Sequence, residues 1–367
     1  MNTQELLTAL AAALADEGPA VKISPDGVEL IEAPEGIALV VGTSGSTGAP
    51  KQTMLSVDAL AASSMATALA LGGEGQWLLA LPVFYVAGAQ VLIRSLFAGT
   101  RPAELHGDFS PESFSAAATE MTDPIRYTSL VPTQLARLLD APESWPALRR
   151  FNAVLLGGAP ASEQLLARAR ELGIKVVTTY GSAETCGGCV YDGDPLEGVE
   201  LALRPDSAGQ QVIWLGGAVL AEGYLDDPAR TAETFQTFDN TRWYRTSDLG
   251  EWDERGALRV LGRADDVLIT GGLKVSAQAV ADSLRGIEGV HEAFVTGLED
   301  AEWGQKVVAA VVSELAESAL HQAAAGILAP HAVPKTFLLL KELPLLPQGK
   351  IDRQSLLEQL QAKDRGK

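Results

Sequence analysis

The sequence predicts an α/β protein, with a large N-terminal α/β domain followed by a small α+β C-terminal domain. Short apolar runs alternate with longer segments that carry apolar residues at helical spacing, as in layered α/β folds. Glycine-containing loops follow several of these runs, and such loops bind ligands in α/β sheets. After Glu197 the pattern changes to short strands and turns, and a compact remainder begins beyond about Asp266.

The N-terminal half is predicted to alternate strands with helices. Pro132 suits the first position of a helix, and Asp58 suits a first turn. Helices are expected within residues 1–18 (ending near Gly18) and at residues 56–71, 132–140 and 162–172. Strands are expected at residues 76–84 and 126–131, and strands running into glycine-containing loops at 36–45, 151–160 and 175–185.

The second half is predicted to be richer in strands. Short strands are expected within residues 210–224 and 256–266. A helix near Ala277 to Leu284, strands at 292–298 and 306–312, a second helix, the apolar segment 335–346 and a polar tail should follow. We therefore predict a large domain at residues 1–264 and a C-terminal domain at residues 265–367.

Charge and hydrophobicity exclude several classes of partner. The chain has 28 Lys and Arg against 47 Asp and Glu, a net charge of -19, which repels nucleic acid and anionic lipid. The uncharged, apolar stretch at residues 77–93 is too short for a membrane span and contains Pro82 and Gly88. The N-terminus lacks the basic region of a signal peptide. We expect a soluble, cytoplasmic protein.

The two cysteines form the pattern Cys186-Gly-Gly-Cys189. Such a pair can be redox-active or supply half of a zinc site. There is no second cysteine pair, and His106, His291 and the remaining histidines are scattered along the chain. The sequence therefore favours two small residues lining a loop over a metal centre.

Residues 42–53, "GTSGSTGAPKQT", combine glycines and hydroxyl side chains with a proline and a lysine. Backbone amides in such a loop can surround phosphate oxygens. The spacing is not that of the P-loop, because Ala49 and Pro50 separate Gly48 from Lys51. Taken alone, the segment fits either a nucleotide-binding loop or an ordinary turn.

Together with the segments that follow it, this loop resembles the phosphate loop of the adenylate-forming superfamily, which includes acyl-CoA synthetases, luciferases and adenylation domains. Five further segments resemble that superfamily's motifs in their order along the chain. They are "GGAP" (157–160), "TTYGSAET" (178–185), "YRTSDLG" (244–250), "GRADDVLITGG" (262–272) and "PQGKIDR" (347–353). Six ordered matches over residues 38–353 make a chance likeness untenable.

The resemblance implies an ATP site. It would comprise Thr43, Ser44, Ser46, Thr47, Gly48, Lys51, Gly157, Gly158, Ala159, Pro160, Tyr180, Gly181, Glu184, Asp248 and Arg263. Tyr180 would stack on adenine, and Asp248 would accept hydrogen bonds from the ribose hydroxyls. Glu184 would hold Mg²⁺, which prefers carboxylate and phosphate oxygens.

The resemblance further implies two half-reactions, in which ATP and a carboxylic acid form an acyl-adenylate and CoA then displaces AMP. Lys350 would act in the first step, where negative charge develops on phosphate oxygens. The C-terminal domain would then rotate about Asp265 and present Gly271 and Gly272 to the pantetheine arm of CoA. A plain turn is the alternative for the two glycines, and a solvated tail lysine for Lys350.

Within this superfamily the chain resembles the compact actinobacterial form of o-succinylbenzoate–CoA ligase of menaquinone biosynthesis. The phosphate loop begins near residue 42, earlier than is usual, and "LIRSLFAG" (92–99), "RYTSLVPTQLARLL" (126–139) and "TCGGCVYDG" (185–193) resemble segments of that enzyme. The second carboxylate of such an acid needs a cation or several donors. Candidates for acid contacts are Arg94, Ser129 and Gln134, with Gly187 and Gly188 leaving room for a ring. A solvent-facing helix position is the alternative for Arg94.

Three residues depart from the superfamily pattern. Gln52 follows the loop lysine in place of a glycine, and Ala183 replaces a Thr or Ser that would touch phosphate. Tyr85 replaces a histidine that would orient the acid, and it carries no positive charge near neutral pH. We count Tyr85 with Lys350 and Glu184 as the expected catalytic residues. Two alternative functions remain: another aryl- or acyl-CoA ligase, or a nucleotide-binding relative without turnover. Members of the superfamily are often dimers, which suggests a homodimer here.

Overall fold

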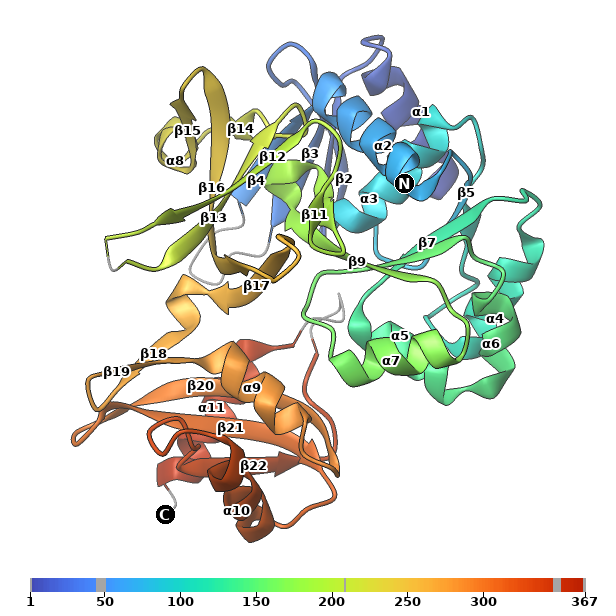
Figure 1. Cartoon of the computed structure of the whole chain (residues 1–367). Coiled ribbons are helices and arrows are strands. Elements are labelled where there is room, and N and C mark those ends of the chain that lie inside the picture. Colours follow the sequence, from blue (N-terminus) through green and yellow to red (C-terminus); the bar gives the residue numbers. More distant parts are fainter. Residues whose placement is uncertain (1, 44–50, 208, 346–350, 366–367) are drawn as a thin grey trace. The chain divides into compact units, whose positions relative to one another are not determined.

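The computed structural model describes residues 2–43, 51–207, 209–345 and 351–365 (Figure 1). The chain divides into two compact units. Unit 1 comprises residues 1–202 and 214–246, and unit 2 comprises residues 203–213 and 247–367. This division falls before the predicted boundary at Asp265, so residues 247–264 group with the C-terminal residues. The hinge at Asp265 stays a prediction.

The main sheet of unit 1 is largely parallel, as the alternation of strands and helices predicts. Its strand order is β11-β10-β9-β8-β7-β5-β6, in which the pairs from β9 to β6 are parallel and β10 is antiparallel to β9. The strands are β5 (Gln76–Leu79), β6 (Ala103–Glu104), β7 (Arg126–Leu130), β8 (Ala153–Leu156), β9 (Val176–Ser182), β10 (Gly187–Tyr191) and β11 (Asp194–Pro195).

Helices connect these parallel strands and bury their apolar faces against the sheet. They are α3 (Val86–Phe97), α4 (Pro111–Glu120), α5 (Pro132–Asp140), α6 (Trp145–Leu148) and α7 (Glu163–Glu171), with the 3-10 turns η1 (Pro142–Ser144) and η2 (Ala183–Thr185). In the core beside β8, Phe114 of α4 and Leu138 of α5 pack with Val154, all fully buried. Burying side chains of this size is the main favourable term in forming the layer.

A second sheet of unit 1 has the order β14-β4-β3-β1-β2. Its strands are β1 (Ala20–Ser24), β2 (Gly27–Ile31), β3 (Ile37–Thr43), β4 (Lys51–Ser56) and β14 (Gly223–Tyr224), and α1 (Thr3–Leu14) and α2 (Val57–Leu71) adjoin it. Ser56 caps α2 by accepting a hydrogen bond from the Ala59 amide, and Gly72 ends the helix in a left-handed conformation. Residues 223–224 thus pair with a strand that is distant in sequence (Figure 1).

The strand-rich section after Glu197 forms a further sheet, which confirms that prediction. The order is β12-β13-β16-β15, with β17 paired to β16, and the division between units passes through β12, β13 and β16. The strands are β12 (Val199–Pro205), β13 (Gln211–Gly217), β15 (Phe235–Phe238), β16 (Thr241–Trp252) and β17 (Leu258–Arg263), with helix α8 (Pro228–Thr234). Asp239 and Asn240, both at positive φ, make the two-residue turn between β15 and β16.

Unit 2 is built around a sheet in the order β19-β18-β21-β20, with β22 paired to β21. Its elements are β18 (Val267–Thr270), β19 (Leu273–Ser276), α9 (Ala277–Arg285), β20 (Val290–Asp300), β21 (Gly304–Ser313), α10 (Glu317–Ile327), β22 (Thr336–Leu340) and α11 (Arg353–Arg365), after the 3-10 turn η3 (Ala264–Asp266). Leu284, Val311 and Phe337 are fully buried in its core. The predicted helix near Ala277 and the strands after it are therefore confirmed.

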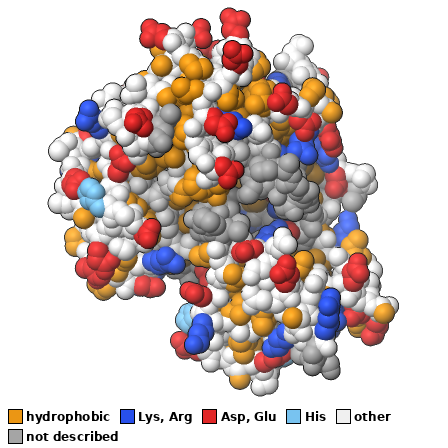
Figure 2. Space-filling model, turned by 180° about the vertical axis from the view of Figure 1, so that it is seen from behind, with side chains coloured by type: hydrophobic (Ala, Val, Ile, Leu, Met, Phe, Trp, Pro, Cys, Tyr) orange, Lys and Arg blue, Asp and Glu red, His pale blue; other side chains and the backbone are white. Residues whose placement is uncertain are grey.

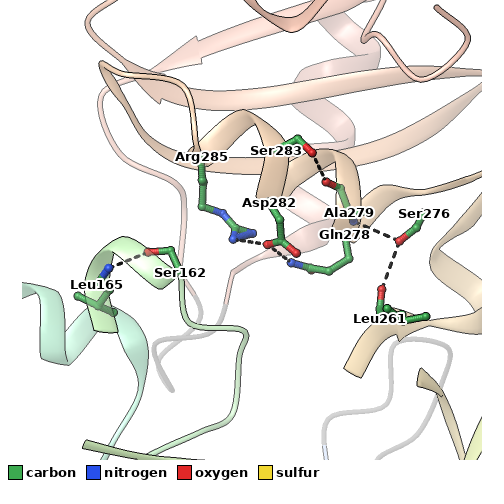
Figure 3. Close-up of polar contacts among 9 residues, drawn as sticks. All are labelled: Ser162, Leu165, Leu261, Ser276, Gln278, Ala279, Asp282, Ser283 and Arg285. Atoms are coloured by element: carbon green, nitrogen blue, oxygen red, sulfur yellow. Dashed lines mark hydrogen bonds and ion pairs between the residues drawn. The ribbon is translucent and has the colours of Figure 1, made fainter. Parts of the chain in front are cut away.

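Helix α9 shows how local side chains define an element (Figure 3). The Ser276 hydroxyl accepts a hydrogen bond from the Ala279 amide at 3.1 Å and donates one to the Leu261 carbonyl at 3.2 Å. Near the other end, Arg285 contacts the Asp282 carboxylate at 2.7 Å. The cap and the ion pair suit a helix start and a helix end.

Three predicted elements differ from those observed. The first helix ends at Leu14, four residues before Gly18, and β5 ends at Leu79 because the chain turns before α3. The expected polar tail is wrong: residues 353–365 form α11. Leu356 and Leu360, one turn apart, are fully buried in a small core of unit 2, while the charged residues around them are exposed or half-buried.

The surface agrees with the dispersed charge of the sequence. On the face in Figure 2, acidic side chains are spread over the molecule with Lys and Arg side chains between them. In the described ranges no helix is both long and apolar enough to cross a membrane.

Candidate active site

Predicted site residues of unit 1 follow the carboxyl ends of its parallel strands. Ser129 is near the end of β7, Gly157 follows β8, and Tyr180 is in the last part of β9. Parallel strands end at the same edge of a sheet, so these residues lie along one edge. The sequence pattern of apolar run followed by glycine had predicted this placement.

Glu184 lies just past β9, on the short turn η2, and is 5% exposed. The turn is held by hydrogen bonds on either side: the Ala221 amide donates to the Glu184 carbonyl at 2.9 Å, and Gln90 Nε2 donates to the Cys186 carbonyl at 2.6 Å. Cys186 adopts a left-handed conformation that ends the turn. The carboxylate is thus presented by a rigid, buried segment.

The structure brings Glu184 together with Lys51 of the phosphate loop, as the resemblance implied. Lys51 Nζ lies 4.0 Å from Glu184 Oε1. Tyr224, which the sequence analysis did not single out, donates its hydroxyl to the same oxygen at 2.8 Å. A buried carboxylate beside a half-buried ammonium is a suitable arrangement for a nucleotide with its divalent cation.

Metal binding at this site depends on Glu184 and on groups supplied by a substrate. No cluster of three or more His, Cys, Asp or Glu side chains that could hold a metal ion occurs in the part of the chain that the structure describes. Mg²⁺ commonly takes one or two protein carboxylates together with substrate phosphates and water. A single buried carboxylate fits that pattern and does not fit a self-contained protein metal site.

The phosphate loop joins two paired strands. Thr43 and Lys51 are register partners at the ends of β3 and β4, and Gly42 faces Gln52. The backbone carbonyl of Gln52 accepts a hydrogen bond from the Leu225 amide at 2.8 Å. Ser44, Ser46, Thr47 and Gly48 lie outside the described residues, so their roles stay predictions.

The predicted adenine-binding segments include glycines whose space is filled by neighbouring atoms. A Cβ on Gly181 would lie 2.1 Å from the Gly187 carbonyl oxygen, and one on Gly157 would lie 2.4 Å from Thr179 Oγ1. Gly158 has φ +79°, and Gly158, Ala159 and Pro160 are exposed after β8. The glycines at 157 and 181 therefore serve the close packing of β8, β9 and β10.

Replacing Gly181 with alanine is expected to destabilise the chain by about 3 kcal/mol, since the overpacking falls on a backbone carbonyl that cannot move aside. Thermal unfolding measures this. Gly326→Ala is the matched control, because Gly326 lies in α10 with nothing within 4 Å of its added Cβ. Equal melting temperatures for Gly181→Ala and the unmodified chain would contradict the argument.

Arg94 is buried, which decides between the two alternatives that the sequence left open. It is 6% exposed on α3, so the solvent-facing position is wrong. Its guanidinium carbon lies 5.0 Å from the ring centroid of Trp77. Its Nε has no hydrogen-bond partner, and no carboxylate of the described residues forms an ion pair with it. A buried guanidinium without an anion is costly, so the position suits an anionic ligand.

The other expected acid contacts differ in their availability. Ser129 is 7% exposed at the end of β7. Gln134 is occupied by backbone: it donates to the Ala80 carbonyl at 2.8 Å and accepts from the Val131 amide at 3.1 Å. A Cβ on Gly188 would meet Thr179 at 3.0 Å, whereas one on Gly187 would be at ordinary contact distance from Gln90. An added Cβ at Gly187 would thus still be in contact with a neighbour, so the structure shows no open space beside either glycine, and their role toward a ring stays a prediction.

Residues that depart from the superfamily pattern lie close to these elements. Tyr85 directly precedes α3, and its partial burial raises the pKa of its hydroxyl to about 12. The phenol therefore stays neutral and can act by shape and hydrogen bonding. Ala183 is 3% exposed on η2 next to Glu184.

The cysteine pair has no metal-binding environment in the described structure. Cys186 and Cys189 are free and fully buried, and burial raises the thiol pKa of Cys189 to about 12 and that of Cys186 further. Thiols in this state are neither good ligands nor good nucleophiles. Cys186 ends the turn η2 and Cys189 lies within β10, so the predicted loop position fits Cys186 and is wrong for Cys189.

Unit 2 brings together two other predicted ATP contacts. Asp248 on β16 and Arg263 on β17 are direct register partners in an antiparallel pair. Gly271 and Gly272, at φ +57° and +78°, form the tight turn between β18 and β19. The turn explains both glycines, and a role toward CoA stays a prediction. Asp265 belongs to η3, and Lys350 lies outside the described residues.

Comparison with known proteins identifies the family of the chain. The AMP-binding enzyme family matches residues 4–225, and the AMP-binding enzyme C-terminal domain matches residues 280–350. A protein of Mycobacterium tuberculosis described as "Probable 2-succinylbenzoate--CoA ligase" is 40% identical over 97% of this chain and 95% of its own length. The 2-succinylbenzoate–CoA ligase of Bacillus pumilus is 32% identical over 87% of this chain and 68% of its own length.

Solved structures show the same likeness in the fold. MatB of Rhodopseudomonas palustris with bound ATP has a TM-score of 0.79 and 27% identity, over 90% of this chain and 69% of its own. The o-succinylbenzoate CoA synthetase MenE of Bacillus subtilis, in complex with its acyl-adenylate OSB-AMP, has a TM-score of 0.76 and 30% identity, over 90% of this chain and 71% of its own. With a family match over most of unit 1 and a relative aligned along nearly the whole chain, this protein is a member of the AMP-binding enzyme family.

Proposed function

We propose that the chain is an AMP-forming acid–thiol ligase that activates 2-succinylbenzoate with ATP and Mg²⁺ and transfers the acyl group to CoA. Both ligase relatives described above carry this activity in their names, one of them at 40% identity. The observation that carries the choice of acid is the buried guanidinium of Arg94, which forms no ion pair with a carboxylate of the described residues. An acid that keeps a second carboxylate after activation would supply the missing anion.

The proposed reaction has two steps. A carboxylate oxygen of the acid attacks the α-phosphorus of ATP, the bond to the pyrophosphate oxygen breaks, and an acyl-adenylate and pyrophosphate result. The sulfur of the deprotonated CoA thiol then attacks the acyl carbon, and AMP leaves with the former carboxylate oxygen. Negative charge grows on phosphate oxygens in the first step, so cations near them lower its barrier.

Particular side chains are suited to that first step. Glu184 would hold Mg²⁺, which would neutralise charge on the phosphates when bound. Lys51 adds a cation 4.0 Å from the same carboxylate. Lys350 is proposed to reach the reacting phosphate and carboxylate, on the resemblance of its sequence segment. On the same ground Tyr180 and Asp248 are proposed to bind adenosine, and Arg263 to reach the ribose or a phosphate.

The acid is proposed to lie with its unreacting carboxylate at Arg94. Ser129 offers a further donor, while the Gln134 side-chain amide already bonds to backbone through both its oxygen and its nitrogen. Gly187 is proposed to lie beside the ring of the acid on the resemblance of its sequence segment alone. We therefore leave Gln134 out of the proposed acid site. Tyr85, before α3, would shape the same pocket as a neutral group.

An acid panel tests the proposal. Pyrophosphate release from ATP is measured with 2-succinylbenzoate, benzoate and a medium-chain fatty acid, each with CoA. Preference for 2-succinylbenzoate is expected. Preference for benzoate or the fatty acid would make the chain another aryl- or acyl-CoA ligase, and bound ATP without release would make it a non-catalytic relative. Cytoplasmic location and a homodimer stay predictions.

Restoring the hydroxyl at position 183 is expected to be tolerated. Ala183→Thr should give an adenylation rate equal to or higher than that of the unmodified chain. Residue 183 directly precedes Glu184 on η2, and a hydroxyl there would be able to donate to phosphate. Steady-state pyrophosphate release measures this. A large fall in kcat would mean that the buried site around Ala183 is adapted to a small residue.

A further inference from the structure

Tyr224 joins two residues of the proposed site that are far apart in sequence. Its hydroxyl donates to Glu184 Oε1 at 2.8 Å, and Lys51 Nζ lies 5.2 Å from the centroid of its ring. Tyr224 is 3% exposed and Glu184 5%. A hydrogen bond between a phenol and a buried carboxylate is stronger than one between neutral groups, and it fixes the carboxylate's orientation.

The backbone holds Tyr224 firmly in this place. On β14 it pairs with Thr53 of β4, the strand that begins at Lys51. Its amide donates to Thr231 Oγ1 at 2.9 Å. Arg242 stabilises the preceding residues by donating to the Ala221 carbonyl at 2.7 Å. One short strand thus links the start of β4 to the turn that carries Glu184.

The chemistry of the two groups determines the direction of the hydrogen bond. An ionised carboxylate can only accept, so the Tyr224 hydroxyl is the donor to Glu184 Oε1. It occupies Oε1 of Glu184, which leaves Oε2 for another partner.

We propose that Tyr224 is a positioning residue for cation-assisted ATP binding: it orients the Glu184 carboxylate toward Mg²⁺ and keeps Lys51 beside the phosphates. This inference rests on the proposed function, since it assigns Glu184 the metal-binding role. Residues that orient a metal ligand through a hydrogen bond typically change metal affinity by about 10- to 100-fold when they are lost.

Tyr224→Phe tests the proposal, because phenylalanine keeps the ring, its packing against Phe235 and its position under Lys51 while removing only the hydroxyl. ATP binding is measured by calorimetry over a Mg²⁺ series, with melting curves to check folding. The Mg²⁺ concentration for half-maximal ATP binding should rise about tenfold. ATP binding without Mg²⁺ should change little.

Tyr191→Phe is the matched control, since Tyr191 is also a buried tyrosine of unit 1 and its hydroxyl bonds to Thr67 at 3.1 Å, not to Glu184. It should leave the Mg²⁺ dependence unchanged. In a Glu184→Gln background, adding Tyr224→Phe should cause no further shift, because both changes act on one contact. An equal shift in both tyrosine variants, a further shift in the Glu184→Gln background, or no shift in Tyr224→Phe would overturn the proposal.

The binding assay uses no acid substrate, so it separates this inference from the proposed function. If the unmodified chain binds ATP with the Mg²⁺ dependence expected and Tyr224→Phe shifts it, the role of Tyr224 stands even when 2-succinylbenzoate releases no pyrophosphate. Pyrophosphate release without a shift in Tyr224→Phe would support the ligase and overturn the role of Tyr224.

Discussion

Arg94→Met is expected to reduce kcat/KM for 2-succinylbenzoate by several hundredfold while making the unliganded protein more stable. Leaving a buried carboxylate without its cation costs about 3–5 kcal/mol. A cost of this size lowers kcat/KM by about several hundredfold or more. Without substrate the substitution should be stabilising. Met removes a buried guanidinium that has no anionic partner among the described residues. The lost contact with Trp77 offsets part of this gain, so the free energy of unfolding should rise by about 1 kcal/mol.

A truncated acid provides the control for Arg94. 3-Benzoylpropanoate has the same reacting chain and ring as 2-succinylbenzoate but lacks the aromatic carboxylate. Arg94→Met should change its kcat/KM little, and Arg94→Lys should retain part of the activity with 2-succinylbenzoate. A similar fall in kcat/KM with both acids would contradict an acid-binding role for Arg94. So would a fall in the free energy of unfolding as large as that caused by truncating other buried side chains.

Lys350→Ala is expected to lower the rate of adenylate formation by at least about a hundredfold. Removing one group that stabilises the charge developing in a transition state typically has an effect of this size. The thioester step should be largely retained, since in the proposed two-step reaction Lys350 serves only the first step. Single-turnover pyrophosphate release measures the first step. Acyl-CoA formation from chemically prepared succinylbenzoyl-adenylate measures the second.

Lys363→Ala is a control for the lysine substitution, because Lys363 lies on α11 and donates to Glu317 at 2.9 Å. Neither half-reaction should change beyond a small effect on stability. If Lys350→Ala weakened the two half-reactions equally, the assignment of Lys350 to adenylation alone would be wrong.

The elements that the sequence predicted well carry strong local signals. Helix α5 begins at Pro132 and ends at Asp140 as predicted, because a helix-start proline precedes apolar residues at helical spacing. Helix α11 was missed because only Leu356 and Leu360 are buried on it, and a few leucines among polar and charged residues resemble a tail. Its stability comes from packing in unit 2, which a local pattern does not reveal.

In the site, too, some roles can be predicted from a sequence segment, whereas others depend on contacts between residues that are distant in sequence. The resemblance to the adenylate-forming superfamily implied that Lys51 and Glu184 belong to one ATP site, and in the structure the two side chains lie 4.0 Å apart. The role of Tyr224 depends on its pairing with Thr53, a residue distant in sequence, and could not be read from its neighbours. The burial of Arg94 did have a signal, since residues 91–93 beside it are apolar and a helix that is apolar all round is buried.

The most direct test of the central claim follows an oxygen atom. The chain is incubated with ATP, Mg²⁺, CoA and 2-succinylbenzoate labelled with ¹⁸O in its aliphatic carboxylate, and the products are analysed by mass spectrometry. Activation through an acyl-adenylate predicts succinylbenzoyl-CoA, pyrophosphate and AMP in equal amounts, with one labelled oxygen in each AMP. ADP and phosphate as products, AMP without label, or no thioester would contradict the account.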